Sequence, residues 1–379
     1  MVMNRLFLLM KEKKASDMFL AVNSPIHLKI DGHLVPINQQ KMDNSTIMAL
    51  LAEVTSSARL QELEHDHELN MGIPVEGVGS FRLSAFQQRG SVSAVVRYIP
   101  SNIPELDSIH MPPLLGDLIM EKRGLLLVVG ATGSGKSTTI ASMLDHRNTL
   151  RAGHILTLED PIEFLFRNKK SIVNQREIGI DAATLDIALK NALRQAPDCI
   201  LIGEIRDKDT MSAALAYAQS GHLVVATLHA NNSYQALTRI ISFYPIESRQ
   251  ALLFDLAATL KAIISQRLVS AIRGGRRPAV EVMLNTRHVS ELIEQGAIGQ
   301  IREAIEKSLS PGSQTFEQAL LHLIKEGAVT QEEALAHADS ASNLYWLLNN
   351  EQSNQARPPE PVQKKDEGEA SFTEFTLNM

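Results

Sequence analysis

The chain has 379 residues, more than a single average hydrophobic core requires, which predicts two domains with additional segments. Hydrophobic residues make up 44% and charged residues 21% of a chain with a net charge of −6, and these totals disfavour the basic surface of a nucleic-acid-binding protein. The one cysteine, Cys199, excludes an internal disulfide and a CxxC zinc site, which fits a reducing cytoplasm.

The N-terminal segment is expected to begin with a short amphipathic helix, because apolar residues recur at i, i+3, i+4 and i+7. These residues are Met3, Leu6, Phe7 and Met10. The apolar run 6–10 is followed by lysines and is far shorter than the roughly 20 apolar residues of a membrane span. Direct membrane insertion is therefore not expected, and the protein would reach a membrane by binding something anchored there.

The rest of residues 1–100 predicts a compact α+β domain. Two pairs of apolar segments, each separated by a turn, favour antiparallel strand pairs. The first pair is 27–30 with 33–36, around Asp31-Gly32, and the second is 79–86 with 91–98. Asn44-Ser45 precede a helical stretch and have side-chain oxygens suited to cap it.

Prolines between residues 100 and 113 interrupt regular structure, so the domain boundary is predicted in a linker over 101–116. From 117 to 350, short aliphatic runs alternate with helical stretches, as expected for a mostly parallel α/β sheet. The runs are 125–129, 154–158, 199–202 and 223–227. After Ala258 the pattern predicts mainly helix, and the acidic, proline-rich tail 351–379 is expected to be disordered.

The stretch 130–138 matches the phosphate-binding pattern GxxxxGK[ST] in full, between a predicted strand and a predicted helix. The candidate ATP-binding residues are Gly130, Ala131, Thr132, Gly133, Ser134, Gly135, Lys136, Ser137 and Thr138. Glycines let successive backbone N–H groups face the phosphates, and the helix start adds its positive dipole end. Lys136 would reach the β- and γ-phosphates, and Ser137 would bind Mg²⁺. A glycine-rich turn without a ligand is the alternative, which the strand–motif–helix order disfavours.

Two acidic segments follow predicted strands and could supply the carboxylates that a phosphoryl-transfer site needs. Glu204 follows the run 199–202 and is the candidate for Mg²⁺ and catalysis at the carboxyl end of the sheet. Glu159, Asp160 and Glu163 follow the run 154–158. Glu163 is the expected base or water-positioning group, and the other two would support metal binding or hydrogen bonds. For each acid, a solvated surface carboxylate remains the alternative.

Two histidines, His222 and His229, bracket the run 223–227, and seven extended residues span roughly 23 Å. Both rings therefore cannot contact one phosphate. His229, at the carboxyl end, is the better nucleotide sensor, and His222 is better suited to a structural or subunit contact. Arg82, Arg97 and Arg123 could neutralise charge on the phosphoryl group, although ordinary surface arginines explain them equally well.

The stretches GATGSGKST, TLEDPIEF, ILIGEIRD and GHLVVATLH, in this order, resemble the secretion and pilus motor ATPases. The resemblance covers most of residues 1–345, including SDMFLAV and IDGHLVPI, and is specific for the type IV pilus retraction ATPase family. It implies a RecA-like P-loop core behind a PAS-like N-terminal domain, a homo-hexameric ring, and ATP-driven pilus disassembly at the inner membrane. It also implies roles for Lys136, Glu163, Glu204, His222 and His229, with Arg82 and Arg97 completing a site.

Some stretches depart from the main retraction motor, which usually has GPTGSGKST and an AIRNLIRE-like helix. Here the equivalents are GATGSGKST and RHVSELI, and a long acidic tail ends in FTEFTL. These departures resemble the accessory motor of the family. The implied partners are the main retraction ATPase and the inner-membrane pilus platform protein, and the tail's last apolar residues are expected to dock on a partner or to be inert.

Other function classes stay open at this point. An assembly motor for pili or type II secretion is disfavoured, because those motors carry a CxxC pair. A nucleic-acid translocase is disfavoured by the weakly negative charge and by the aromatic content of 4%. A scaffold that binds nucleotide without hydrolysis is disfavoured because Lys136, Glu163 and Glu204 are all present.

Overall fold

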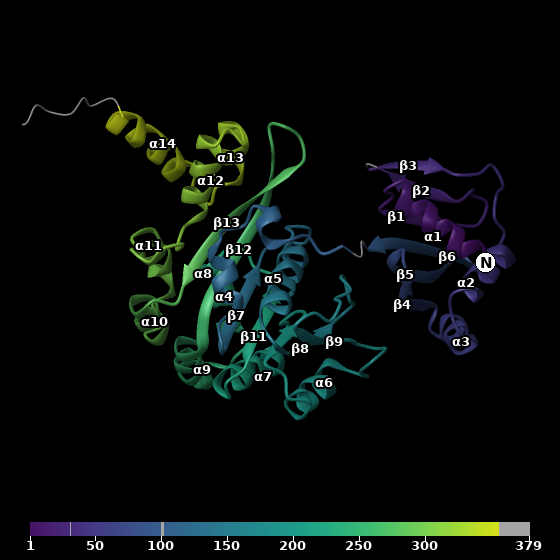
Figure 1. Cartoon of the computed structure of the whole chain (residues 1–379), viewed down its shortest axis with the longest axis horizontal. Coiled ribbons are helices and arrows are strands. Elements are labelled where there is room, and N and C mark those ends of the chain that lie inside the picture. The colour runs from purple at the N-terminus through teal and green to yellow at the C-terminus, as the bar shows by residue number, and fades with distance from the viewer. Residues whose placement is uncertain (31, 100–101, 356–379) are drawn as a thin grey trace, which may run out of the picture.

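The computed structural model describes residues 1–30, 32–99 and 102–355. Two separate β-sheets, one six-stranded and one seven-stranded, lie on opposite sides of the segment 101–116 (Figure 1). That segment, expected as a linker, includes the short helix η1 and the start of α4, whose apolar side chains pack against the second sheet. Asp31, Pro100, Ser101 (the first residue of that segment) and residues 356–379, which include most of the predicted tail, lie outside the described residues.

The first sheet is antiparallel, with the strand order β3-β2-β1-β6-β5-β4. Its strands are β1 (Asp17–Leu20), β2 (His27–Ile30), β3 (His33–Pro36), β4 (Glu68–Val75), β5 (Gly79–Gln88) and β6 (Ser91–Ile99). Its helices are α1 (Val2–Glu12), α2 (Asn44–Ala52) and α3 (Ser57–Asp66). The predicted N-terminal helix and both strand pairs are confirmed. The predicted cap is one residue off, because Asp43 accepts the hydrogen bond from Thr46 N–H at 2.8 Å.

The second sheet has the order β13-β12-β7-β11-β10-β8-β9 and is parallel except for β13. Its strands are β7 (Gly124–Val129), β8 (Gly153–Glu159), β9 (Ser171–Glu177), β10 (Cys199–Ile202), β11 (Leu223–Leu228), β12 (Leu260–Ser270) and β13 (Arg276–Leu284). This is the predicted α/β fold with a RecA-like P-loop core. Every aliphatic run predicted as a strand is one, and β7 lies in the middle of the sheet.

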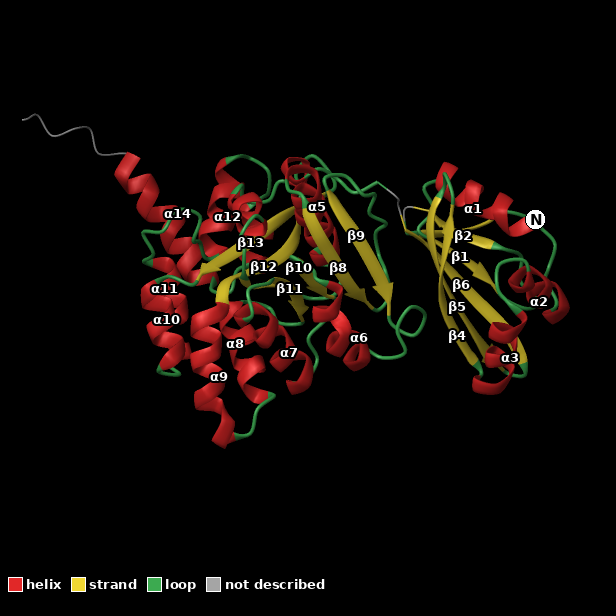
Figure 2. Ribbon diagram, turned by 60° about the horizontal axis from the view of Figure 1, so that its bottom comes forward, coloured by secondary structure: helices red, strands yellow, loops and turns green. Residues whose placement is uncertain are grey.

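Helices cover both faces of the second sheet (Figure 2). The helices of this part are α4 (Leu114–Ile119), α5 (Lys136–Leu150), α6 (Leu185–Ala192), α7 (Lys208–Gln219), α8 (Ser233–Ser242), α9 (Ile246–Thr259), α10 (Arg287–Glu294), α11 (Ile301–Glu306), α12 (Phe316–Lys325), α13 (Gln331–His337) and α14 (Ala341–Gln355), with η1 (Leu106–Ile109), η2 (Leu193–Gln195) and η3 (Ile298–Gln300). Helices α4 and α5 pack on one face, and α6 to α11 pack on the other. Within the described residues, no helix is both long and apolar enough to span a bilayer.

The prediction that the chain after Ala258 is mainly helical is confirmed for the elements α10 to α14 and wrong for the residues before them. There, β12 and β13 form a long antiparallel hairpin at one side of the sheet. The run from Leu260 to Leu268 has apolar residues at spacings that fit either a helix or a strand buried on both faces. The pairing with β7 shows that this run is a strand, because β12 covers the edge of β7 that would otherwise be open.

Successive side chains of β7 point to opposite faces of the sheet, so a single substitution tests the packing on one face. Leu126 is fully buried and points to the face covered by α4 and α5, whereas Leu125 and Leu127 point to the other face. Replacing Leu126 with alanine is expected to lower the free energy of unfolding by about 2–5 kcal/mol, because it leaves a cavity in a packed layer. Denaturant titration measures the change. Leu150→Ala, at a position that is 51% exposed, is the control and should cost less than about 0.5 kcal/mol.

Candidate active site

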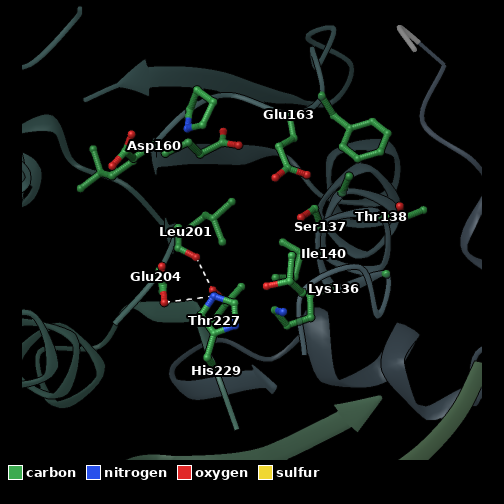
Figure 3. Close-up of a pocket in the computed structure, with 18 of the residues that line it drawn as sticks. Lys136, Ser137, Thr138, Ile140, Asp160, Glu163, Leu201, Glu204, Thr227 and His229 are labelled. Atoms are coloured by element: carbon green, nitrogen blue, oxygen red, sulfur yellow. Dashed lines mark hydrogen bonds and ion pairs between the residues drawn. The ribbon is translucent and has the colours of Figure 1, made fainter. Parts of the chain in front are cut away.

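The carboxyl ends of the parallel strands meet at one edge of the second sheet, and a cleft of about 780 Å³ opens there (Figure 3). The cleft is lined by residues that follow β7, β8, β10 and β11, which are the four strands predicted to deliver functional side chains. The P-loop residues among them are Thr132, Gly133, Gly135, Lys136, Ser137 and Thr138. Sequence positions far apart in the chain therefore converge, as the strand pattern predicts.

The P-loop has a backbone that only glycine allows at its two most constrained positions. Gly130 has φ +155°, and a β-carbon there would lie 2.6 Å from the Gln266 carbonyl oxygen. Gly135 has φ +93° and would bring a β-carbon to 2.9 Å from Gln266 Nε2, which donates a hydrogen bond to the Ser134 carbonyl at 2.7 Å. Strand β12 thus supports the loop from below, and the start of α5 directs its free N–H groups into the cleft.

Lys136 is the cation at the centre of the cleft. It is 9% exposed, and its Nζ donates to the carbonyl oxygens of Gly130 at 2.8 Å and Ala131 at 2.9 Å. Burial lowers the pKa of Lys136, while the negative charges of Glu204 and Glu163 oppose that shift. The ammonium group is therefore held over the loop with no ion-pair partner among the described residues, and it can attract a phosphate.

The acidic segment after β8 divides into two kinds of carboxylate. Glu163 lines the cleft and points toward the side of Lys136 and Ser137 (Figure 3). Glu159 accepts hydrogen bonds from the Thr157 hydroxyl at 2.6 Å and from Gln175 at 3.2 Å, and burial raises its pKa. Glu159 is thus tied into the sheet. Glu163 and Asp160 both line the cleft, and Asp160 lies 3.7 Å from Arg206, so Glu163 is the carboxylate of this segment that points toward the P-loop side.

Glu204 is paired on the side of the cleft that lies across from Lys136 (Figure 3). Its Oε1 lies 3.2 Å from His229 Nε2, and its Oε2 accepts a hydrogen bond from Arg206 Nε at 2.6 Å. Arg206 Nη1 also lies 3.7 Å from Asp160 Oδ2. The network connects the segments after β8, β10 and β11, so a displacement of one of these segments alters the contacts of the other two.

His222 and Arg123 lie at the opposite edge of the sheet, because they directly precede the strands β11 and β7. The His222 ring contacts the Ser220 hydroxyl at 3.1 Å and lies edge-on to Tyr217, and its carbonyl accepts from Gly124 N–H at 3.0 Å. Arg123 lines a separate surface hollow beside Lys261. Within this chain, Arg123 is therefore not part of the cleft, and the separation of the two histidines follows the sequence argument.

The two arginines of the first sheet are cross-strand neighbours but reach different places. Arg82 on β5 pairs with Arg97 on β6 in register. Arg97 lines the cleft, and its Nε also donates to Asp17 Oδ1 at 2.8 Å. Arg82 does not line this cleft in the single chain and lies near the carboxylate of Glu177.

Comparison with known proteins agrees with this geometry. The family model described as "Type II/IV secretion system protein" matches residues 1–336. The type IV pilus ATPase PilU of Pseudomonas aeruginosa is 44% identical over 349 residues, covering 92% of this chain and 91% of PilU. The chain belongs to the type II/IV secretion system family. As a member of that family it is a P-loop ATPase.

Two further relatives of this secretion family member come from pilus retraction. The type IV pilus retraction ATPase PilT of P. aeruginosa is 37% identical over 330 residues, covering 87% of this chain and 96% of PilT. A crystal structure of the pilus retraction motor PilT with bound ADP matches the fold with a TM-score of 0.84 and 38% identity, over 90% of this chain and 99% of that chain.

Two arginines that line the cleft of this secretion ATPase were not predicted from the sequence. Arg206 is two positions beyond Glu204, so its place in the same motif was an available signal. Arg276 lines the cleft from the start of β13. It was missed because the β12–β13 hairpin was predicted as helix, and no local pattern marks it.

Proposed function

We propose that this chain is an ATP-hydrolysing motor that powers type IV pilus retraction. The observation that carries the proposal is the convergence of Lys136, Glu163 and Glu204 in one cleft, in a chain 38% identical to a retraction motor that binds ADP. The motor would act as a homo-hexameric ring in the cytoplasm and reach the inner membrane through the pilus platform protein.

The residues of the cleft have separable roles in this proposal. Lys136 and the P-loop N–H groups bind the β- and γ-phosphates, which lowers the cost of charge on the transferred group. Glu163 orients the attacking water and accepts its proton as the oxygen bonds to the γ-phosphorus and the bond to ADP breaks. His229, in contact with Glu204, is placed to respond to the loss of the γ-phosphate.

The chemistry of the donors fits Mg²⁺. The described residues hold no group of three or more His, Cys, Asp or Glu side chains that could enclose a metal. Mg²⁺ is usually held by one or two protein oxygens together with substrate phosphates and water. The Ser137 hydroxyl and the Glu204 carboxylate, both lining the cleft, are the residues that would hold it, and bound Mg²⁺ would neutralise phosphate charge.

A ring would complete the site with cations from the first sheet. Arg97 already faces the cleft, and Arg82 is its cross-strand neighbour. A small shift of the first domain, or the first domain of an adjacent subunit, would bring such an arginine to the γ-phosphate. His222, at the far edge of the sheet, is placed for a contact with another subunit.

We further propose that the chain works as an accessory motor beside a main retraction ATPase. Its identity to PilU, 44%, exceeds its identity to PilT of the same organism, 37%. The stretch RHVSELI forms α10 and stands where the main motor usually has an AIRNLIRE-like helix. The residues that α10 exposes in this chain therefore differ from those that the corresponding helix of the main motor exposes.

The test is genetic. A clean deletion and a Glu204→Gln substitution are compared for twitching in strains with and without the main motor. Glu204→Gln is expected to match the deletion in both backgrounds, because it removes the charge that pairs with His229 and Arg206. Glu64→Gln, at an exposed site on α3, should match wild type. Wild-type twitching of Glu204→Gln in both backgrounds would show that hydrolysis here is not the working step.

A further inference from the structure

The first domain contacts the second near the end of β9. Glu177 is the last residue of that strand and is only 7% exposed, an unusual place for a carboxylate. Among the described residues, no cation lies within ion-pair distance of it. A buried charge of this kind is costly unless hydrogen bonds compensate it, so its partners indicate what it does.

One partner belongs to the segment that carries the proposed catalytic acid. Glu177 Oε2 accepts a hydrogen bond from Ile162 N–H at 3.1 Å. Ile162 directly precedes Glu163 in the chain. Glu177 therefore fixes the backbone next to Glu163, whose side chain points into the cleft (Figure 3).

The other partners belong to the first domain. Gly72 on β4 lies against the Glu177 carboxylate, because a β-carbon at Gly72 would lie 3.2 Å from Glu177 Oε2, and the Gly72 backbone favours the charged form of this carboxylate. Arg82 lies opposite Gly72 in the sheet and favours the charged form of the carboxylate. Burial and the negative charge of Asp181 raise the pKa of Glu177, while the Ile162 hydrogen bond, the Gly72 backbone and the charge of Arg82 oppose the rise.

We propose that Glu177 is a positioning residue through which the first domain sets the place of Glu163 in the cleft. The Glu177 carboxylate contacts the Gly72 backbone of β4 on one side and accepts a hydrogen bond from the Ile162 amide on the other. A movement of β4 would therefore shift the backbone next to Glu163. This inference rests on the proposed role of Glu163. It gives the first domain an effect on hydrolysis that needs no contact with the nucleotide.

The contact also offers a matched control. Arg59 Nη2 lies 3.4 Å from the Gly179 carbonyl oxygen, so it joins the same two domains two residues beyond Glu177. Among the described residues, the polar partners of the Arg59 side chain are Glu62 and the Gly179 carbonyl, both outside the segment of Glu163. Loss of Arg59 weakens the domain contact without touching the connection to Ile162.

The experiment measures ATPase kinetics and fluorescent-nucleotide affinity of the full chain. Glu177→Ala is expected to lower kcat by up to about 100-fold with KM and nucleotide affinity unchanged, since a misplaced catalytic group costs about that much. Glu177→Gln keeps the size and one acceptor oxygen and should recover part of the rate. Gly72 does not have a positive φ, so alanine fits the backbone at this position. Gly72→Ala should lower kcat less than Glu177→Ala, because the added methyl group displaces the Glu177 carboxylate without removing it.

The pattern across variants decides the outcome. The double variant Glu177→Ala with Gly72→Ala should be no slower than Glu177→Ala, and Arg59→Ala should match wild type. Wild-type kcat in Gly72→Ala, or a loss in Arg59→Ala equal to that in Glu177→Ala, would overturn the proposal. A wild-type rate in Glu163→Gln would instead overturn the role of Glu163, and that result is read independently of Glu177.

Discussion

Replacing Lys136 with alanine is expected to lower the rate of ATP hydrolysis by about 100- to 1,000-fold. Lys136 Nζ is held by two P-loop carbonyl groups and is nearly buried, so its position is already organised before a phosphate arrives. Within the part of the chain that the structure describes, no other lysine lines the cleft, and water cannot replace a fixed charge in a partly enclosed site. Phosphate release from the purified protein measures the rate.

The same variant should bind nucleotide more weakly, because the ammonium group attracts the phosphates in the ground state as well as in the transition state. Lys190→Ala is the matched control. Lys190 is exposed on α6 and pairs with Asp186, so its removal should leave the rate unchanged. A Lys136→Ala protein with wild-type turnover would contradict the assignment of this loop as the phosphate site.

The sequence was sufficient to predict the cleft because its residues follow buried strands. Strands such as β7 and β10 are short aliphatic runs, which are typical of a parallel sheet covered on both faces. Parallel strands place their carboxyl ends at one edge, so the sequence alone predicts that Lys136, Glu163 and Glu204 lie together. The motif order alone carried that inference.

The remaining parts of the site depend on contacts that no local pattern encodes. The apolar spacing of strand β12 fits a helix and a strand equally well. The sequence therefore predicts neither its hairpin with β13 nor the place of Arg276 in the cleft. The Gly72–Glu177 contact joins residues that lie far apart in sequence, in two domains. It depends on how the two sheets pack, which periodicity does not report.

Replacing Glu163 with glutamine is expected to lower ATP turnover by about 100- to 10,000-fold while nucleotide affinity stays near wild type. The amide keeps the size of the side chain but cannot accept the proton of the attacking water. The hydrogen bonds of the neighbouring segment, from Ile162 to Glu177 and from Phe166 N–H to Gln175, do not involve the Glu163 side chain, so the fold should persist. Single-turnover hydrolysis and fluorescent-nucleotide titration separate the two effects.

Two further variants test whether Glu163, and not a neighbouring carboxylate, is the base that accepts the proton. Glu306→Gln, at an exposed site on α11, controls for loss of a charge and should hydrolyse ATP at the wild-type rate. Asp160 lies 3.7 Å from Arg206 and lines the same cleft, so Asp160→Asn tests the rival base. If Asp160→Asn loses hydrolysis with nucleotide affinity intact and Glu163→Gln does not, proton transfer belongs to Asp160. The converse result places it on Glu163, because a base is identified by losing turnover without losing binding.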